Sequence, residues 1–241
     1  MKRILLGMLT PSSNTILEPL TSAMVSGVPH VSAHFGRFRV TEISLKGTAL
    51  GQFDDAPILE AARLLADAQV DVICWNGTSS GWLGFDADER LCESIRKATG
   101  IPACTSVLAL NEVLERTNAR DFGLVTPYLD DVQAAIVANY HKSGFNCIAE
   151  RHLNQSVNFS FSEIGTDTIA GLVREVAQAN PKAISTFCTN MNAAADVPAL
   201  EQALGLPIYD TVSLAVWKSL KVAGVDPRAV KGWGRLFQEI A

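Results

Sequence analysis

The sequence predicts an α/β fold of two Rossmann-like halves related by a pseudo-twofold axis, each half a parallel sheet flanked by helices. Three observations predict this fold. The chain has 241 residues, of which 48% are hydrophobic, so it can bury a substantial core. Short apolar runs alternate with segments of helical periodicity, which favours parallel sheets covered on both faces. Finally, the chain repeats its own motifs in a fixed order.

Each element follows from local patterning. Apolar runs rich in β-branched residues predict strands, and helical spacing of apolar residues, as for Ile58, Ala62 and Leu65, predicts helices. The predicted strands are 3–9, 32–40, 70–76, 120–126, 145–151, 182–187 and 206–209. The predicted helices are 15–25, 56–68, 86–98, 106–116, 129–143, 166–179, 195–204 and 211–223.

Three motifs recur between the halves. GMLTPS at 7–12 returns as GLVTPY at 123–128, VDVICWNGT at 70–78 corresponds to PKAISTFCT at 181–189, and GIP at 100–102 returns as GLP at 205–207. Because the order is kept, duplication explains the matches better than chance turns do. We therefore expect an N-terminal half at 1–115 and a C-terminal half at 116–211. The final segment, 212–241, is expected to pack back on the first half, and the active site to lie in the cleft between the halves.

Composition excludes several classes of function. The net charge is −5 and no basic stripe is present, which disfavours nucleic-acid and anionic-membrane partners. No apolar stretch is long enough to span a membrane. The five cysteines form no CxxC pair and the four histidines are scattered, so we expect no metal site and no cofactor. Without a secretory signal, a reduced cytoplasmic setting is expected. We expect a monomer or a small homo-oligomer.

The repeated motifs end predicted strands. In open parallel sheets, ligands bind at the carboxyl ends of strands, where loops and helix N-termini present N–H groups. The residues at these ends are 10–14, 77–80, 126–128 and 188–190. Their polar side chains are hydroxyls, amides, one phenol and one thiol, with no carboxylate. Such a set suits an anionic ligand that is held by hydrogen-bond donors.

One cysteine stands out by its place in the repeat. Cys188 follows an apolar strand and precedes a polar loop, and Gly77 occupies the corresponding position in the first half. Peptide N–H groups at such a strand end are expected to lower the pKa of a thiol. Cys188 is therefore the candidate functional cysteine.

Other apolar and sulfur-containing residues are expected to be structural. Four residues are candidates to line an apolar pocket for an aryl group: Trp75, Trp82, Leu83 and Phe187. Because Trp75 and Phe187 lie in predicted strands, we expect these two to pack the sheets instead. The remaining cysteines lie within predicted elements or at their edges and are expected to be small buried hydrophobes: Cys74, Cys92, Cys104 and Cys147.

Taken together, seven motifs resemble one known superfamily. They are GMLTPSSNT at 7–15, NGTS at 76–79, RKATGIPACT at 96–105, TPYLDDV at 126–132, FCT at 187–189, LGLP at 204–207 and GWGRLF at 232–237. On these motifs, which span nearly the whole chain, the sequence resembles the aspartate/glutamate racemase superfamily. Within it, the arylmalonate decarboxylases and maleate cis–trans isomerases are most similar. In the superfamily's racemases and isomerases two cysteines face the substrate, one from each half. The decarboxylases carry Gly-Thr-Ser in place of the first cysteine.

On this contrast the chain is decarboxylase-like, since Gly77 precedes Thr78 and Ser79. The resemblance implies that Cys188 protonates the enediolate that remains after loss of carbon dioxide. It also implies that Thr78, Ser79 and Tyr128 donate hydrogen bonds to that enediolate. Physical chemistry agrees, because moving a proton between two faces of a carbon needs an acid/base group on each face, whereas decarboxylation needs only one donor.

The first loop resembles the isomerases instead. Pro11, Ser12 and Asn14 match their pattern, in which the asparagine binds a substrate carboxylate. Asn158 falls near a second substrate-binding asparagine of the isomerases. Gly77 and Thr189 complete the implied substrate-binding set. Asn14 is equally well placed to cap helix 15–25.

The leading hypothesis is therefore a cofactor-independent decarboxylase of an α-substituted malonate or a similar small diacid, with Cys188 as proton donor. The first alternative is an isomerase of a small unsaturated dicarboxylate such as maleate. The second is a racemase of the aspartate, glutamate or hydantoin type, which would need a base opposite Cys188. The third is a carboxylate-binding protein without catalysis.

Overall fold

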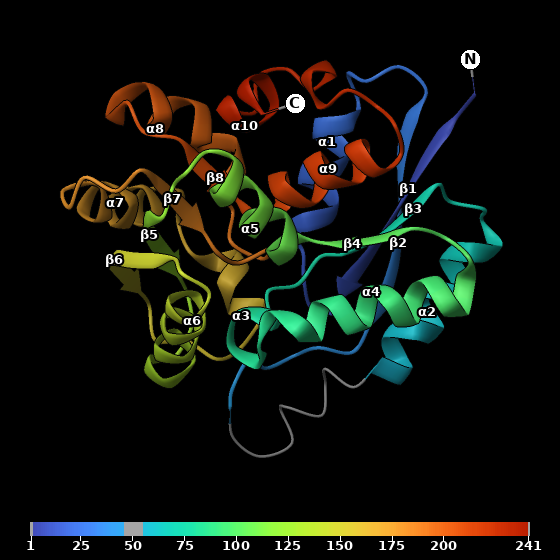
Figure 1. Cartoon of the computed structure of the whole chain (residues 1–241), viewed down its shortest axis with the longest axis horizontal. Helices are drawn as coiled ribbons and strands as arrows, with labels where there is room; N and C mark the ends of the chain where they lie inside the picture. The colour runs from blue at the N-terminus through green and yellow to red at the C-terminus, as the bar shows by residue number, and fades with distance from the viewer. Residues whose placement is uncertain (1, 46–54, 241) are drawn as a thin grey trace.

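Two four-stranded parallel sheets form the centre of the molecule (Figure 1). The structure is a computed structural model that describes residues 2–45 and 55–240. The first sheet has the strand order β2-β1-β3-β4 and the second has β6-β5-β7-β8, so the same order occurs twice. This confirms the predicted fold class. The strands are β1 (Ile4–Pro11), β2 (Val31–Phe38), β3 (Val72–Trp75), β4 (Ala103–Thr105), β5 (Asp121–Thr126), β6 (Asn146–His152), β7 (Ala183–Thr186) and β8 (Ile208–Asp210).

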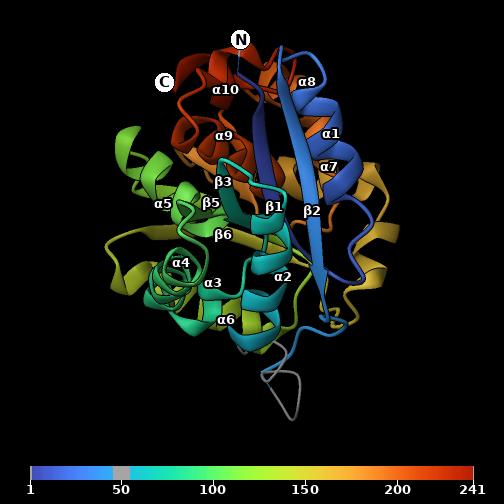
Figure 2. The same ribbon diagram turned by 90° about the vertical axis from the view of Figure 1, so that its right-hand side faces the viewer.

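Helices cover both faces of each sheet, which is why strands such as β3 and β7 are buried at every residue. Figure 2 shows α1 and α2 on opposite sides of β2. No helix in the described part of the chain is long and apolar enough to cross a membrane. The helices are α1 (Leu17–Val25), α2 (Asp55–Asp67), α3 (Ser80–Leu83), α4 (Phe85–Thr99), α5 (Ser106–Arg116), α6 (Asp130–Lys142), α7 (Thr166–Ala177), α8 (Val197–Leu204), α9 (Thr211–Val222) and α10 (Arg235–Glu239), with short 3-10 turns η2 (Phe159–Glu163), η3 (Ala194–Asp196) and η4 (Pro227–Ala229).

The strand registers match the sequence repeat. Gly7 of β1 pairs with Ile73 of β3, and Gly123 of β5 pairs with Ile184 of β7. Each pair joins the first strand of its half to the strand that carries the site loop. The two halves therefore place their corresponding loops at corresponding sheet edges, as the repeat predicts.

Both of these glycines are required by close packing. A Cβ atom on Gly7 would lie 2.9 Å from the Val70 side chain, and one on Gly123 would lie 2.3 Å from Val176. Real Cβ atoms do not approach other heavy atoms so closely, so a side chain at either position would push the neighbouring element away from the sheet. The recurrence of glycine in the two motifs thus has a packing cause in each half.

Two parts of the fold differ from the expectation. Strand β4 is absent from the predicted strands, because its three residues are too few to show periodicity and its pairing with β3 defines it. Helices α3 and α10 are also short, with four and five residues, and were not predicted.

The two C-terminal helices pack on different parts of the molecule. Helix α9 packs on α1 and α5 of the first half, whereas α10 packs on α9 and β8. The boundaries 1–115, 116–211 and 212–241 stay a prediction.

Candidate active site

A small cavity lies where the carboxyl ends of β1, β3, β5 and β7 meet. Its volume is about 20 Å³, enough for roughly one water molecule. A molecule much larger than water does not fit in this closed cavity. The lining residues come from both halves: Pro11, Val40, Ile43, Trp75, Gly77, Thr78, Trp82, Tyr128, Asn158, Cys188 and Thr189.

Most of the sequence-predicted site residues line this one cavity. Those that do are Pro11, Gly77, Thr78, Tyr128, Asn158, Cys188 and Thr189. Three others are buried or partly buried close by but do not line it: Ser12, Asn14 and Ser79. The structure therefore brings together a thiol, a phenol, two threonine hydroxyls and one carboxamide, with no carboxylate among them.

Cys188 is buried, with 2% of its surface exposed, and lies two residues beyond the end of β7. The backbone N–H of Asn190 points at its sulfur at 3.4 Å, and the Tyr128 hydroxyl also hydrogen-bonds the sulfur. Burial nevertheless raises the pKa of the Cys188 thiol to about 12. The expectation that strand-end N–H groups would lower this pKa is wrong, because desolvation of the thiolate outweighs those hydrogen bonds. The thiol is protonated at neutral pH and is therefore an acid.

Two hydroxyls lie beside the thiol as a pair. The Thr78 and Tyr128 oxygens are 2.6 Å apart, which joins the first half to the second. The Tyr128 ring packs edge-on against Trp82 and Phe161, with centroid distances of 5.3 and 5.6 Å, so its hydroxyl is held in place. Burial raises the pKa of Tyr128 well above its usual value, and the phenol remains a donor.

Two backbone donors lie at the site. Within residues 2–45 and 55–240, no backbone carbonyl accepts from the N–H groups of Cys188 and Thr189. They follow strand β7, and the two residues carrying them line the cavity. Unpaired N–H groups at such a strand end are suited to bind a carboxylate oxygen.

Asn14 joins the halves rather than lining the cavity. Its Oδ1 accepts hydrogen bonds from the N–H groups of Ile16 and Leu17, at 3.0 and 2.9 Å, which caps the start of α1 as expected. Its Nδ2 donates to the Thr189 carbonyl at 3.0 Å. Both polar atoms of the Asn14 side chain are therefore engaged with the protein, and the residue positions the loop that carries Thr189.

Ser12 and Asn158 belong to a second connection between the halves. The Ser12 hydroxyl accepts from the Val40 N–H at 3.1 Å, and the Asn158 amide donates to the Ser13 hydroxyl at 2.7 Å. Residues 40–43 and 156–158 also pair through the backbone, with an antiparallel bridge between Glu42 and Val157. These two segments supply three of the cavity's lining residues and hold it closed.

The sequence interpretation favoured sheet packing for Trp75 and kept a pocket-lining role as the alternative. Its side chain lines the cavity, although we expected it to pack the sheet. A Cβ atom built on Gly77 would lie 1.9 Å from the Trp75 ring, so the indole fills the space beside that glycine. A strand's last residue can turn its side chain either way, and no pattern in the sequence distinguishes the two. The expectation for Phe187 is met, because it is fully buried and outside the cavity lining.

Two buried carboxyl groups support the site loops from behind, and neither was predicted. Asp88 of α4 lies beside the hydroxyls of Thr105 and Ser80, and burial raises its pKa to about 7. Asp210, at the end of β8, accepts from Thr186 at 2.9 Å, and burial raises its pKa to about 6. Both look like ordinary helix-start acids in the sequence, so only the packing identifies them.

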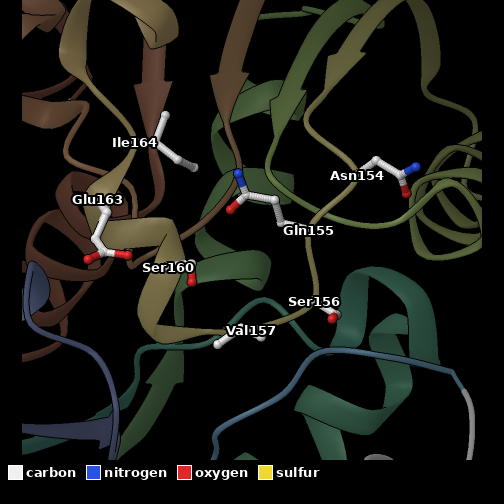
Figure 3. Close-up of a pocket in the computed structure, with 7 residues that line it drawn as sticks. All are labelled: Asn154, Gln155, Ser156, Val157, Ser160, Glu163 and Ile164. Carbon is white, nitrogen blue, oxygen red and sulfur yellow. The ribbon is translucent and has the colours of Figure 1, made fainter.

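A larger hollow lies outside the site. Its volume is about 490 Å³, and its lining residues, which Figure 3 shows, belong to the segment of chain that follows β6 and precedes α7. It is lined by one segment of the chain, including Gln155, Ser160 and Glu163, and none of the predicted site residues borders it. Among the described residues, no cluster of three or more histidine, cysteine, aspartate or glutamate side chains is arranged to hold a metal ion.

Comparison with known proteins decides the family. Residues 14–237 match the family model described as arylmalonate decarboxylase. The chain belongs to this family. It is 24% identical to an arylmalonate decarboxylase from Bordetella bronchiseptica, over 97% of this chain and 96% of the relative. It is also 26% identical to a maleate isomerase from Nocardia farcinica, over 97% and 95% of the two chains.

Solved structures share the fold over the whole chain. The maleate isomerase from Pseudomonas putida S16 superposes with a TM-score of 0.89 at 21% identity, covering 99% of each chain. A liganded arylmalonate decarboxylase mutant, with one glycine changed to cysteine and one cysteine to serine, gives a TM-score of 0.85 at 21% identity. It covers 99% of this chain and 100% of the mutant. The comparisons confirm the resemblance and the expectation of an enzyme from the decarboxylase and isomerase branch.

Proposed function

We propose that this chain is a cofactor-independent decarboxylase of an α-substituted malonate or a similar small diacid, with Cys188 as its proton donor. The observation that carries the proposal is the asymmetry of the cavity. Its single thiol comes from the second half, and Gly77 takes the corresponding place in the first half. Decarboxylation needs a proton donor on one face only. Membership of the arylmalonate decarboxylase family supports the same reaction.

The proposed step begins with the substrate dianion. The bond between the α-carbon and the departing carboxylate breaks, carbon dioxide leaves, and the bonding electron pair enters the remaining carboxylate as an enediolate. The α-carbon then takes the proton of the Cys188 thiol, and the thiolate recovers a proton from water. In balance, one dianion and one proton yield one monocarboxylate and carbon dioxide. The pKa of about 12 supports this role, because the thiol holds its proton until the enediolate forms.

The enediolate is proposed to be stabilised by Thr78, Tyr128 and the N–H groups of Cys188 and Thr189. The hydroxyl pair is supported by its 2.6 Å contact beside the thiol. Each such donor contributes about 3 kcal/mol, or roughly a hundredfold in rate, when charge develops in a water-excluded site. Ser79, from the same loop as Thr78, is the proposed third hydroxyl donor.

The substrate's carboxylates are proposed to be held by both halves. Asn158 and Thr189 line the cavity from the second half and Pro11 from the first. All four polar residues are hydrogen-bonded to protein in the closed cavity, so in this proposal they bind substrate only when the surrounding segments rearrange: Ser12, Asn14, Asn158 and Thr189. The proposed ligand is thus a small-molecule carboxylate. A monomeric or small oligomeric state and a cytoplasmic location stay predictions.

The test is direct turnover. Purified protein is incubated with methylmalonate and with phenylmalonate, and carbon dioxide release and the monocarboxylate product are measured. We expect Cys188→Ala to lower the rate by roughly 10²–10⁴-fold, the usual contribution of a positioned acid. Cys92→Ala, which removes a half-buried thiol outside the cavity, is the matched control and should keep the rate. If the folded protein turns over no substituted malonate, the proposal is wrong.

Isomerisation of a small unsaturated diacid is the second candidate. Three relatives are maleate isomerases, and Asn158 lines the cavity while Asn14 lies next to it, bonded to Thr189. One structural neighbour, a mutant of the Nocardia farcinica maleate isomerase, carries a covalently bound succinylcysteine. A thiol that attacks carbon reacts as thiolate, and the raised pKa of Cys188 disfavours that form. Conversion of maleate to fumarate that disappears in Cys188→Ala would favour this candidate.

The two remaining alternatives make different predictions. A racemase needs a base from the first half as well as Cys188, but Gly77 holds the position that corresponds to Cys188 there. A racemase would also exchange the α-proton of an enantiopure acid with solvent deuterium. A carboxylate-binding protein without catalysis would bind phenylacetate or propionate and turn over neither malonate nor maleate.

A further inference from the structure

The internal symmetry identifies one residue that makes the halves unequal. Leu9 of β1 pairs with Trp75 of β3, and at the corresponding register Val125 of β5 pairs with Thr186 of β7. Trp75 and Thr186 are therefore equivalent positions, each two residues before the site position of its half. The first half carries the largest side chain there, and the second half carries a small one.

The consequence of this difference is steric. Thr186 turns its hydroxyl to Asp210 at 2.9 Å, and it does not line the cavity beside Cys188. The Trp75 indole instead reaches the space beside Gly77, where a Cβ atom would lie 1.9 Å from one ring carbon and 2.4 Å from two others. No side chain other than hydrogen fits at position 77 while the indole is there.

Neither the Trp75 side chain nor the loop at Gly77 can move away from this contact easily. The Trp75 side chain is 1% exposed, and its ring packs against Phe38 with a centroid distance of 5.1 Å. The Gly77 carbonyl accepts a hydrogen bond from the Ser106 hydroxyl at 2.7 Å, which fixes the loop from the other side. The indole is therefore a fixed wall of the cavity.

We infer that Trp75 is a specificity-determining residue: its indole excludes a second acid/base side chain from the first half and limits the α-substituent of the substrate to a small group. The size limit rests on the proposed function. The closed cavity of about 20 Å³ is too small for any diacid, so its volume does not set the limit. The limit comes from the indole itself, which fills the space beside Gly77 and is held there by burial and by its contact with Phe38. Malonates with a substituent of about methyl size are the favoured class.

The size limit is tested by binding of product acids, which are not turned over. Isothermal titration calorimetry on the full chain gives the Kd of phenylacetate and of propionate. We expect the wild type to prefer propionate and Trp75→Leu to shift the Kd ratio toward phenylacetate by at least about tenfold. Trp217→Leu, at a buried tryptophan outside the cavity, is the matched control and should leave the ratio unchanged. An unchanged ratio in Trp75→Leu overturns the size limit.

The steric exclusion is tested by a double-mutant cycle in thermal unfolding. We expect Gly77→Cys to lower the Tm by at least about 4 °C through overpacking, and Trp75→Leu to relieve most of that loss when the two are combined. Trp82→Leu, at the other tryptophan that lines the cavity, should not relieve it. Additive Tm shifts for Gly77→Cys and Trp75→Leu overturn the exclusion. Failure of every malonate to release carbon dioxide rejects the proposed function alone, because neither the Kd ratio nor the Tm cycle depends on turnover.

Discussion

Replacement of Asp88 by asparagine tests how the site loop is supported. Asp88 is 2% exposed and lies between the Ser80 and Thr105 hydroxyls, behind the loop that carries Gly77 and Thr78. Thr105 accepts from the Leu108 N–H at 3.1 Å, so its own hydrogen is free to donate to the carboxyl group. Asparagine has nearly the same shape and keeps one carbonyl oxygen beside the Thr105 hydroxyl, but it carries no charge at any pH.

The magnitude follows from the pKa. Burial raises the pKa of Asp88 from 3.8 to about 7, so the folded state holds the proton over a pH range in which the unfolded state has lost it. The contribution of the Asp88 proton to the free energy of unfolding is therefore complete below pH 3.8. It declines as the pH rises to about 7, and above that pH it is lost. At 1.36 kcal/mol per pH unit, the decline amounts to about 4 kcal/mol. Asp210, with a pKa raised to about 6, adds a decline of the same sign.

Urea unfolding at pH 4.5, 6 and 8 measures the difference. We expect Asp88→Asn and the wild type to have similar free energies of unfolding at pH 4.5, and the variant to gain by about 2–4 kcal/mol at pH 8. Taking the difference between the two proteins removes the part that Asp210 contributes. Asp167→Asn, at an exposed carboxylate in the first turn of α7, is the matched control and should follow the wild type. A difference between Asp88→Asn and the wild type that stays constant across pH would refute the reasoning.

Three further predictions concern the cavity and its neighbours. Tyr128→Phe keeps both ring contacts but removes the hydroxyl between Thr78 and Cys188, so we expect kcat on the accepted malonate to fall about a hundredfold, whereas an unchanged kcat would exclude Tyr128 as a donor. Alkylation of Cys188 by iodoacetamide, followed by mass spectrometry, should be slow at pH 7 and accelerate roughly tenfold per pH unit toward the pKa of about 12; a rate constant that does not change between pH 7 and 9 would contradict the assigned pKa. Asn14→Ala removes the α1 cap and the bond to Thr189, and should lower the free energy of unfolding by about 2 kcal/mol, while Asn14→Asp should retain the cap and lose less.

The fold could be predicted from the sequence because of the repeat, whose recurring glycines are required by close packing in each half. Gly7 and Gly123 sit at equivalent registers and are both excluded from carrying a side chain by their neighbours. Cys188 was identifiable for a related reason. It follows a repeated strand, and this places it at the carboxyl end of the sheet however the helices pack. Strand β4 was missed because its existence depends on pairing with β3, a contact between residues 30 positions apart, as Ile73 with Ala103.

The site residues that sequence reasoning missed or expected elsewhere depend on packing direction. Asp88 lies in the first turn of α4, where an acidic residue is usual and normally exposed, and only the packing of α4 on α3 and β4 turns it inward. Trp75 is the last residue of an apolar run, a pattern that predicts a residue of the sheet core, yet its side chain lines the cavity. The spacing of apolar residues predicts which side chains are buried, but it does not predict whether a buried side chain packs in the core or lines a cavity.

The electrostatic surroundings of Cys188 bear on which chemistry the cavity favours. A thiol that adds to a double bond or removes an α-proton must first become a thiolate, which requires a lowered pKa. Here burial raises the pKa, and the Asp210 carboxylate behind Thr186 raises it further, against the hydrogen bonds from Tyr128 and the Asn190 N–H. A thiol with a pKa of about 12 delivers a proton readily to an enediolate carbon, which is a far stronger base. The second half thus carries a thiol at its site position, Cys188, and keeps it protonated. At the corresponding position the first half has Gly77, and the Trp75 indole fills the space beside it. Both features favour delivery of a proton from a single face.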